Sequence, residues 1–302
     1  MPDLSALADP GFLAVQCLNG LTQAMFLFLI ASGLSLIFGV LGVLNFAHGS
    51  LYMLGAYLSY TIASWFVGSP TAFWVALILG SIGVALVGGI IESVFLRPVY
   101  RREELDQLLV TYALVLIISD LVKLAWGAEN RSGSRPALLA GSVDIAGRDF
   151  PTYNLFVLAV GPLVALGLWL LLRRTQFGRL VRAAANDREM VGVVGVNVTG
   201  LFTGVFMLGA WLGGLGGGLA APIGAIFPGM DVEIIVESFI VVVVGGMGSL
   251  GGTLLGALII GQLNAFGILF FPRFAIVFVY ILMAVVLVIR PWGLLGRPVT
   301  RG

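Results

Sequence analysis

The chain has 302 residues, of which 59% are hydrophobic and only 10% are charged, and its mean hydropathy is +1.07. Soluble globular domains average about 45–50% apolar and about 25% charged residues, so this composition excludes an ordinary soluble protein. The formal net charge of +1 does not indicate a nucleic-acid partner. The single cysteine excludes an internal disulfide and a cysteine-only metal cluster.

Apolar stretches recur along the chain, and many approach the roughly 20 residues that a helix needs to cross a bilayer. They lie at 12–31, 33–44, 49–67, 71–95, 108–126, 152–172, 200–221, 233–246, 252–270 and 274–289. A membrane β-barrel instead shows alternating segments of about ten residues. The sequence therefore predicts an all-α, polytopic transmembrane helical bundle of about 8–10 membrane segments, forming a single domain over residues 1–302.

The first two stretches cannot form two full crossings. Residues 12–44 would span roughly 50 Å as one helix, which is too long for one crossing and too short for two. We therefore expect a broken or re-entrant segment near residues 33–49, around Gly39, Gly42 and Asn45.

The basic residues predict the orientation in the membrane. Eleven of the sixteen lie in three stretches, 97–106, 173–190 and 290–302, which the positive-inside rule places in the cytoplasm. The polar stretch 127–151 then becomes an extracytoplasmic loop. The same parity predicts a cytoplasmic C-terminus and an extracytoplasmic N-terminus.

Several kinds of chemistry are missing from the sequence. Lys123 is the only lysine and no G-x-x-x-x-G-K-[ST] motif surrounds it, so the chain has no P-loop for ATP. One histidine and one cysteine supply neither a catalytic triad nor a metal cluster. We expect no catalytic residue, no metal and no cofactor in this chain.

Polar residues interrupt the apolar sequence near the expected break. An unpaired amide or imidazole in hydrocarbon costs several kcal/mol, so Asn45 and His48 should face protein, water or a helix break. In one interpretation, Asn45 caps a helix that begins near Phe46, and His48 binds a backbone carbonyl at the cytoplasmic interface. In the other, Asn45, His48, Gly49 and Ser50 line a substrate path beside a helix N-terminus.

Three carboxylates lie within or beside apolar helices. Glu92 has Arg97 nearby and Asp120 has Lys123, so local neutralisation is expected for both. Glu237 has no basic neighbour in the sequence. Glu237 is therefore a candidate for the pathway or for a proton-linked role, although structural hydrogen bonding is the simpler interpretation.

The basic stretch at 173–199 predicts a cytoplasmic coupling loop. It holds a short amphipathic helix around Arg182–Val191, with Ala and Val on one side and Arg, Asp and Glu on the other, followed by glycines and Asn197 as stops. Such a loop can simply fix the topology, or it can dock into a groove of another protein.

Four motifs together resemble a known family. "LSLIFGVLGVLNFAHGSLYMLGAY", "IESVFLRPVYRR" followed by "LLVTYALVLIISD", "GRLVRAAANDREMVGVVGVN" and the terminal "RPWGLLG" are similar to the permease subunits of ATP-binding-cassette importers for branched-chain amino acids. The resemblance runs from about residue 15 to 297 in the expected order. Val191 is a mild departure, because the family tends to have alanine there.

The resemblance implies the partners and the energy source. Such a permease pairs with a homologous second permease or a copy of itself in a bacterial-type inner membrane, sits on two cytoplasmic ATP-binding subunits that use the ATP, and receives substrate from an extracytoplasmic binding protein. By position, the segment that docks on the ATPase comprises Arg182, Ala183, Ala185, Asn186, Asp187, Gly195 and Asn197.

Two alternatives remain open. Urea and short-chain amide importers use permeases of similar sequence, and nothing in a path of Gly, Ala and Val names its cargo. In a different class, Glu237 and the broken segment also fit an ion-coupled secondary transporter or a channel that works alone.

Overall fold

The computed structural model describes residues 9–296, and this part of the chain is mainly helical. Its α-helices are α1 (Pro10–Leu41), α2 (His48–Trp65), α3 (Ala72–Ile91), α4 (Glu104–Trp126), α5 (Thr152–Arg174), α6 (Gln176–Asn186), α7 (Arg188–Val193), α8 (Val198–Ala220), α9 (Met230–Gly245), α10 (Leu250–Phe270) and α11 (Ala275–Ile289). The all-α prediction is confirmed. The predictions for the two chain ends lie outside the described residues.

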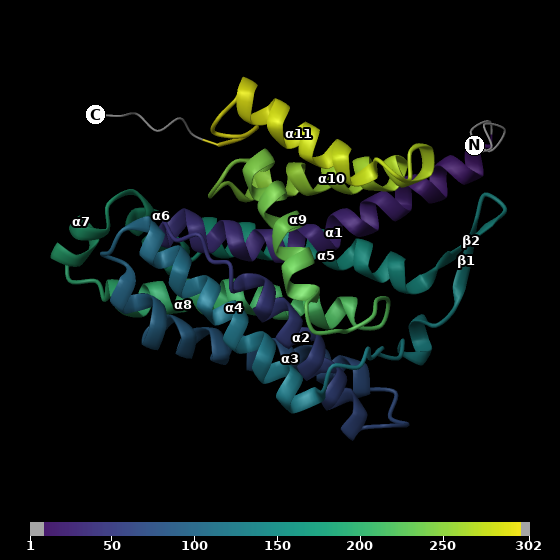
Figure 1. Cartoon of the computed structure of the whole chain (residues 1–302), viewed down its shortest axis with the longest axis horizontal. Coiled ribbons are helices and arrows are strands. Elements are labelled where there is room, and N and C mark those ends of the chain that lie inside the picture. The colour runs from purple at the N-terminus through teal and green to yellow at the C-terminus, as the bar shows by residue number, and fades with distance from the viewer. Residues whose placement is uncertain (1–8, 297–302) are drawn as a thin grey trace.

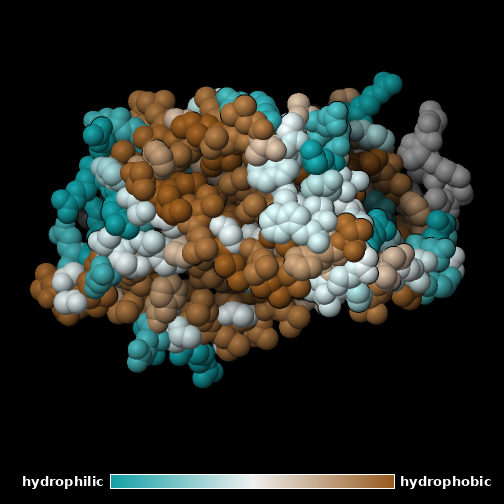
Figure 2. All heavy atoms as spheres, turned by 90° about the horizontal axis from the view of Figure 1, so that it is seen from below, coloured by the Kyte–Doolittle hydropathy of each residue, from teal (hydrophilic) through white to brown (hydrophobic). Residues whose placement is uncertain are grey.

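Six of the described helices are long and apolar enough to cross a membrane: α1, α3 with its continuation to Val99, α4, α5, α8 and α10. Helices α2, α9 and α11 are shorter, with 18, 16 and 15 residues. Hydrophobic residues cover most of the face shown in Figure 2, and hydrophilic residues gather mainly toward its two ends. The chain is a multi-pass membrane protein.

Helix α1 is continuous over 32 residues, about 48 Å at 1.5 Å per residue, so the apolar stretches 12–31 and 33–44 belong to one helix. Gly39 does not interrupt this helix. It instead lets α1 pack closely against the backbone of Gly248. The predicted break is confirmed but begins at Gly42, whose positive φ of 73° ends the helix in the left-handed conformation.

Helix α1 is also the centre of the bundle. It packs against α5, α8, α9 and α10, and most of its apolar span is buried. Most of the long helices extend broadly along the molecule's longest axis, whereas α9 lies across them (Figure 1). Helices α6 and α7 mark one end, here called the basic end. The hairpin of strands β1 (Ser142–Ile145) and β2 (Arg148–Pro151) marks the other, the hairpin end.

Glycines let the central helices approach closely. A Cβ atom at Gly209 would lie 2.7 Å from the side chain of Ile37, and one at Gly256 would lie 2.6 Å from the carbonyl oxygen of Val241. Gly217 is tighter still, because its Cβ would collide with the carbonyl oxygen of Tyr52. Small residues at helix interfaces allow this contact between backbones.

The hairpin was not predicted. Strands β1 (Ser142–Ile145) and β2 (Arg148–Pro151) pair antiparallel, and the Asp144 side chain accepts a hydrogen bond from the Gly147 N–H in the turn. Asp-x-x-Gly within the polar stretch is the signal that could have indicated it. Arg148 donates two hydrogen bonds to Asp9, at 2.7 and 3.1 Å, and this guanidinium holds the pKa of the Asp9 carboxyl below its ordinary value.

Candidate functional site

The connection between α1 and α2 folds back into the bundle. His48 Nε2 lies 3.0 Å from the carbonyl oxygen of Ile30, which is eleven residues before the end of α1 at Leu41. At 1.5 Å per residue, the first turn of α2 therefore lies about 16 Å back from that end. Residues 42–47 cover this distance without helical structure, so the break is re-entrant and α2 begins inside the bundle.

The side chains at the break are buried without full partners. Asn45, His48 and Ser50 are all 0% exposed. Neither side-chain atom of Asn45 that can form a hydrogen bond has a partner among the described residues, and the same holds for His48 Nδ1. Buried polar groups normally find a partner, so the break holds unused hydrogen-bonding capacity in the interior.

The capping interpretation of Asn45 is wrong. Ala47 is the N-cap of α2 and makes no side-chain capping bond; the backbone carbonyl of Asn45 accepts the His48 N–H at 3.2 Å. His48 does donate to a backbone carbonyl, as that interpretation expected, but it does so in the interior and not at an interface.

A second helix begins beside the break. Ser50 Oγ donates to Asp231 Oδ2 at 2.8 Å, and Asp231 is only 1% exposed in the first turn of α9. Gly49 lies so close to the Asp231 carbonyl oxygen that a Cβ would collide with it. The N-terminal turns of α2 and α9 thus meet, and helix N-termini carry partial positive charge. The other carboxylate oxygen of Asp231 has no partner among residues 9–296.

Glu237 lies on a different face of α9 from Asp231. Val232, Glu233 and Val236 are exposed and Glu237 is partly exposed, which puts all four on one face of α9 that this chain leaves uncovered. Ile235 and Ser238 occupy the opposite, buried face. The sequence singled out Asn45, His48, Gly49 and Ser50, which lie together at the break, but not Asp231, whose signal was a carboxylate at the start of an apolar helix. No group of His, Cys, Asp and Glu that could hold a metal occurs in the part searched.

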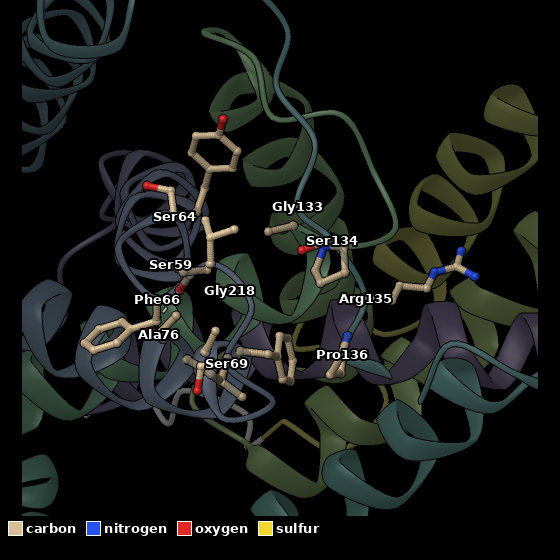
Figure 3. Close-up of a pocket in the computed structure, with 18 of the residues that line it drawn as sticks. Ser59, Ser64, Phe66, Ser69, Ala76, Gly133, Ser134, Arg135, Pro136 and Gly218 are labelled. Carbon is tan, nitrogen blue, oxygen red and sulfur yellow. Dashed lines mark hydrogen bonds between the residues drawn. The ribbon is translucent and has the colours of Figure 1, made fainter. Parts of the chain in front are cut away.

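The far end of α2 opens on a pocket of about 480 Å³ at the hairpin end. Helices α2, α3 and α8 and the loop at 132–137 supply its wall. Hydroxyl groups of Ser59, Ser64, Ser69 and Ser134 lie around it, whereas the Arg135 side chain extends away (Figure 3). Helix α2 therefore runs from the buried break to a mainly apolar cavity that carries several hydroxyl groups.

The coupling loop forms two helices and not the single one predicted for 182–191. Helix α6 ends at Asn186, because Asp187 leaves the helical conformation and its side chain accepts the N–H groups of Glu189 and Met190 at 3.0 and 2.9 Å. Asp187 is thus the N-cap of α7. Asn197 caps α8 in the same way at 2.9 Å from Gly200 N, so it begins a helix in addition to ending the loop.

Residues of the expected docking segment are largely exposed. Arg182, Ala183, Ala185, Asn186, Asp187, Gly195 and Asn197 all face outward, and Gly195 has a φ of 85°. The amphipathic pattern predicted for 182–191 holds only in part, since Ala184 is buried but Ala183 and Ala185 are exposed. Val191, the residue that departs from the family pattern, is also buried, so the departure lies on the inner face.

A buried carboxylate ties this region to α3. Glu92 is 0% exposed and begins a π-helical segment, Glu92–Leu96, that extends α3. It accepts hydrogen bonds from Arg97 at 2.9 Å, from the Tyr100 hydroxyl at 3.1 Å and from the Thr203 hydroxyl on α8 at 2.8 Å. Both predicted local ion pairs are confirmed, the second being Lys123 with Asp120 at 3.1 Å.

Comparison with known proteins decides the family. The family model described as the permease component of branched-chain amino acid transport systems matches residues 16–289. The chain belongs to this permease family. The match covers the motifs identified in the sequence except the terminal "RPWGLLG", which begins at Arg290.

Named relatives match this permease over nearly its whole length. The high-affinity branched-chain amino acid transport system permease protein BraD of Pseudomonas aeruginosa is 31% identical, covering 94% of this chain and 95% of the relative. LivH of Escherichia coli K12 is 30% identical with the same coverage. A probable LivH of Methanocaldococcus jannaschii is 30% identical over 89% of this chain and 88% of its own.

Proposed function

We propose that this chain is the membrane-spanning subunit of an ATP-driven importer of branched-chain amino acids. The family match over residues 16–289 carries the proposal. The basic end is cytoplasmic by the positive-inside rule, and the hairpin end faces outward. The working assembly adds a second permease, homologous or identical, two cytoplasmic ATP-binding subunits that hydrolyse ATP, and an extracytoplasmic binding protein.

The basic end presents a surface suited to the ATPase. Met190, Val193 and Val194 are 59%, 82% and 70% exposed, which leaves apolar side chains of the α7 region in contact with solvent. The exposed charged residues Asp187, Arg188 and Glu189 directly precede them in the chain. Apolar residues framed by charges are typical of a helix that docks in a groove, so the surface of α6 and α7 is the coupling segment.

Replacing Asp187 tests the geometry of that segment. We expect Asp187→Ala to remove the N-cap of α7 at a cost of about 1 kcal/mol and to lower ATP-driven uptake several-fold, because the docking surface loses its shape. Asp187→Ser retains a capping oxygen and should retain uptake. Equal uptake by wild type and Asp187→Ala in the reconstituted importer would contradict the assignment.

The re-entrant break supplies chemistry for a zwitterion. The N-terminal turns of α2 and α9 can face a carboxylate, Asp231 can face an ammonium group, and surrounding Gly, Ala and Val accept an aliphatic side chain. ATP-driven closure of the partner subunits would move α6 and α7, and rigid helices would carry that movement to the break. Glu237 and Glu233 would line the path from the uncovered face of α9.

Replacing Asn45 distinguishes a role in transport from a role in packing. Its amide is buried and unpaired, so Asn45→Leu, which keeps the branched shape and the number of heavy atoms, should leave the melting temperature unchanged or raise it. If the break lines the path, the same variant loses uptake. We expect His48→Leu to lose uptake as well, together with some stability, because the Ile30 carbonyl loses its donor. Intact uptake in both variants would return the break to a purely structural role.

Substrate class is tested by competition in the complete importer. Proteoliposomes holding the permease pair and the ATPases are given the binding protein with radiolabelled leucine or urea. We expect ATP-dependent leucine uptake that excess isoleucine and valine suppress and that urea does not. Uptake of urea or acetamide without leucine would instead assign the chain to amide import.

A further inference from the structure

A groove of about 570 Å³ lies near the basic end, and no residue of the re-entrant break is among its lining residues. Helices α1, α5, α6 and α10 supply its walls. Most of its surface is apolar, with Phe28, Leu166, Trp169 and Leu254 among the lining residues. Leu166 and Trp169 are 52% and 42% exposed, so the groove opens on the outside of the bundle, where α5 meets the hydrocarbon.

Two arginines from different helices line the groove. Arg173 ends α5 and Arg182 lies on α6. Neither forms an ion pair with an acidic residue anywhere in residues 9–296. The Arg173 guanidinium lies 5.7 Å from the centre of the Trp169 ring, which holds it beside the apolar wall. The groove thus combines hydrocarbon walls with two uncompensated positive charges.

The position of the groove in the membrane indicates which molecule can bind in it. Arg173 lies at the end of a 23-residue apolar helix, where a lipid headgroup meets water, and Trp169 is typical of that interface. An acyl chain matches the apolar wall, and a phosphate without a compensating cation matches the two guanidinium groups. A zwitterionic headgroup would bring its own ammonium group toward these arginines.

We propose that this groove binds an anionic phospholipid of the phosphatidylglycerol type. The phosphate lies at Arg173 and Arg182, and an acyl chain lies along Phe28, Trp169 and Leu254. Because Arg182 is on α6, the lipid braces the junction of α5 with the first helix of the coupling segment. The proposal concerns a lipid and stands apart from the transported substrate.

Native mass spectrometry of the purified full-length chain tests the charged end. The chain is incubated with dioleoylphosphatidylglycerol or dioleoylphosphatidylcholine at equal concentration, and retained lipid is counted. We expect phosphatidylglycerol to be retained preferentially and Arg173→Gln to weaken its retention about fivefold. Arg174→Gln is the matched control, since the Arg174 guanidinium also lies 6.0 Å from the centre of the Trp169 ring but Arg174 does not line the groove.

A second pair of variants tests the apolar wall. Gly251 lines the groove and has no atom within 4 Å of an added Cβ, so Gly251→Leu fills the groove without a backbone clash. Gly167→Leu adds the same side chain to the outer face of α5, where a Cβ also meets nothing. We expect the first to lose phosphatidylglycerol and the second to keep it.

Three results would overturn the proposal. Equal retention of the two lipids shows no preference for the anionic headgroup. Equal losses in Arg173→Gln and Arg174→Gln show a diffuse charge effect and no defined site. If millimolar inorganic phosphate displaces the lipid and Gly251→Leu still retains phosphatidylglycerol normally, the two arginines bind a free anion and not a lipid.

Discussion

Replacing Gly217 by valine should prevent the chain from forming a stable bundle. Gly217 of α8 lies directly against the Tyr52 carbonyl oxygen of α2, and backbone cannot move aside as a flexible side chain can. Any side chain there separates α8 from the helix that carries the break. We expect a loss of about 3 kcal/mol or more, seen as a lower melting temperature and a lower yield of monodisperse protein in detergent.

Gly167→Val is the control for Gly217→Val. It carries the same cost of a β-branched residue in a helix, but an added Cβ at Gly167 meets no atom. The control should melt close to wild type. If both variants had the same melting temperature, the role of Gly217 would not be to allow the close approach of α2 and α8.

Loss of Glu92 should have the second largest effect. Glu92→Ala removes the acceptor shared by Arg97, Tyr100 and Thr203 and leaves three donors beside a small cavity. Arg97 is 40% exposed, so water compensates part of the loss, and we expect about 2 kcal/mol of destabilisation. Because Thr203 lies in α8 soon after the coupling segment, ATP-driven uptake should fall more than stability alone explains.

An exposed ion pair serves as the control that separates the effect of charge from the effect of burial. Asp120 and Lys123 form the other predicted ion pair, but their side chains are 72% and 50% exposed. Asp120→Ala should therefore change stability by less than about 0.5 kcal/mol. Glu92→Gln, which keeps an acceptor, should lie between wild type and Glu92→Ala. Equal melting temperatures for Glu92→Ala and Asp120→Ala would show that the buried network adds nothing.

Hydropathy predicted the helices well because each membrane helix must be apolar over its length. The expected stretch 152–172 corresponds to α5, Thr152–Arg174, and 252–270 corresponds to α10, Leu250–Phe270. It could not show where α1 ends, because Gly39 and Gly42 look alike in sequence. Only the structure shows that the first packs on Gly248 while the second adopts a positive φ.

The break was found by length and by the cost of burying polar groups, but its surroundings were not. Asp231 is 181 residues from Ser50, and no local pattern predicts that pairing. The same limit applies to Glu92, whose Arg97 partner is local and was predicted, whereas Thr203 is 111 residues away. Asp187 was predicted to belong to the coupling segment, but its capping of α7 depends on the backbone conformation and was not predicted.

Uptake with and without ATP tests the central claim most directly. Proteoliposomes contain either this chain alone or the chain with its second permease, two ATP-binding subunits and the binding protein, and accumulation of radiolabelled leucine is measured with ATP, a proton gradient or a sodium gradient. We expect accumulation only in the complete assembly and only with ATP. Accumulation by the chain alone on an ion gradient would contradict the importer assignment and establish an ion-coupled transporter.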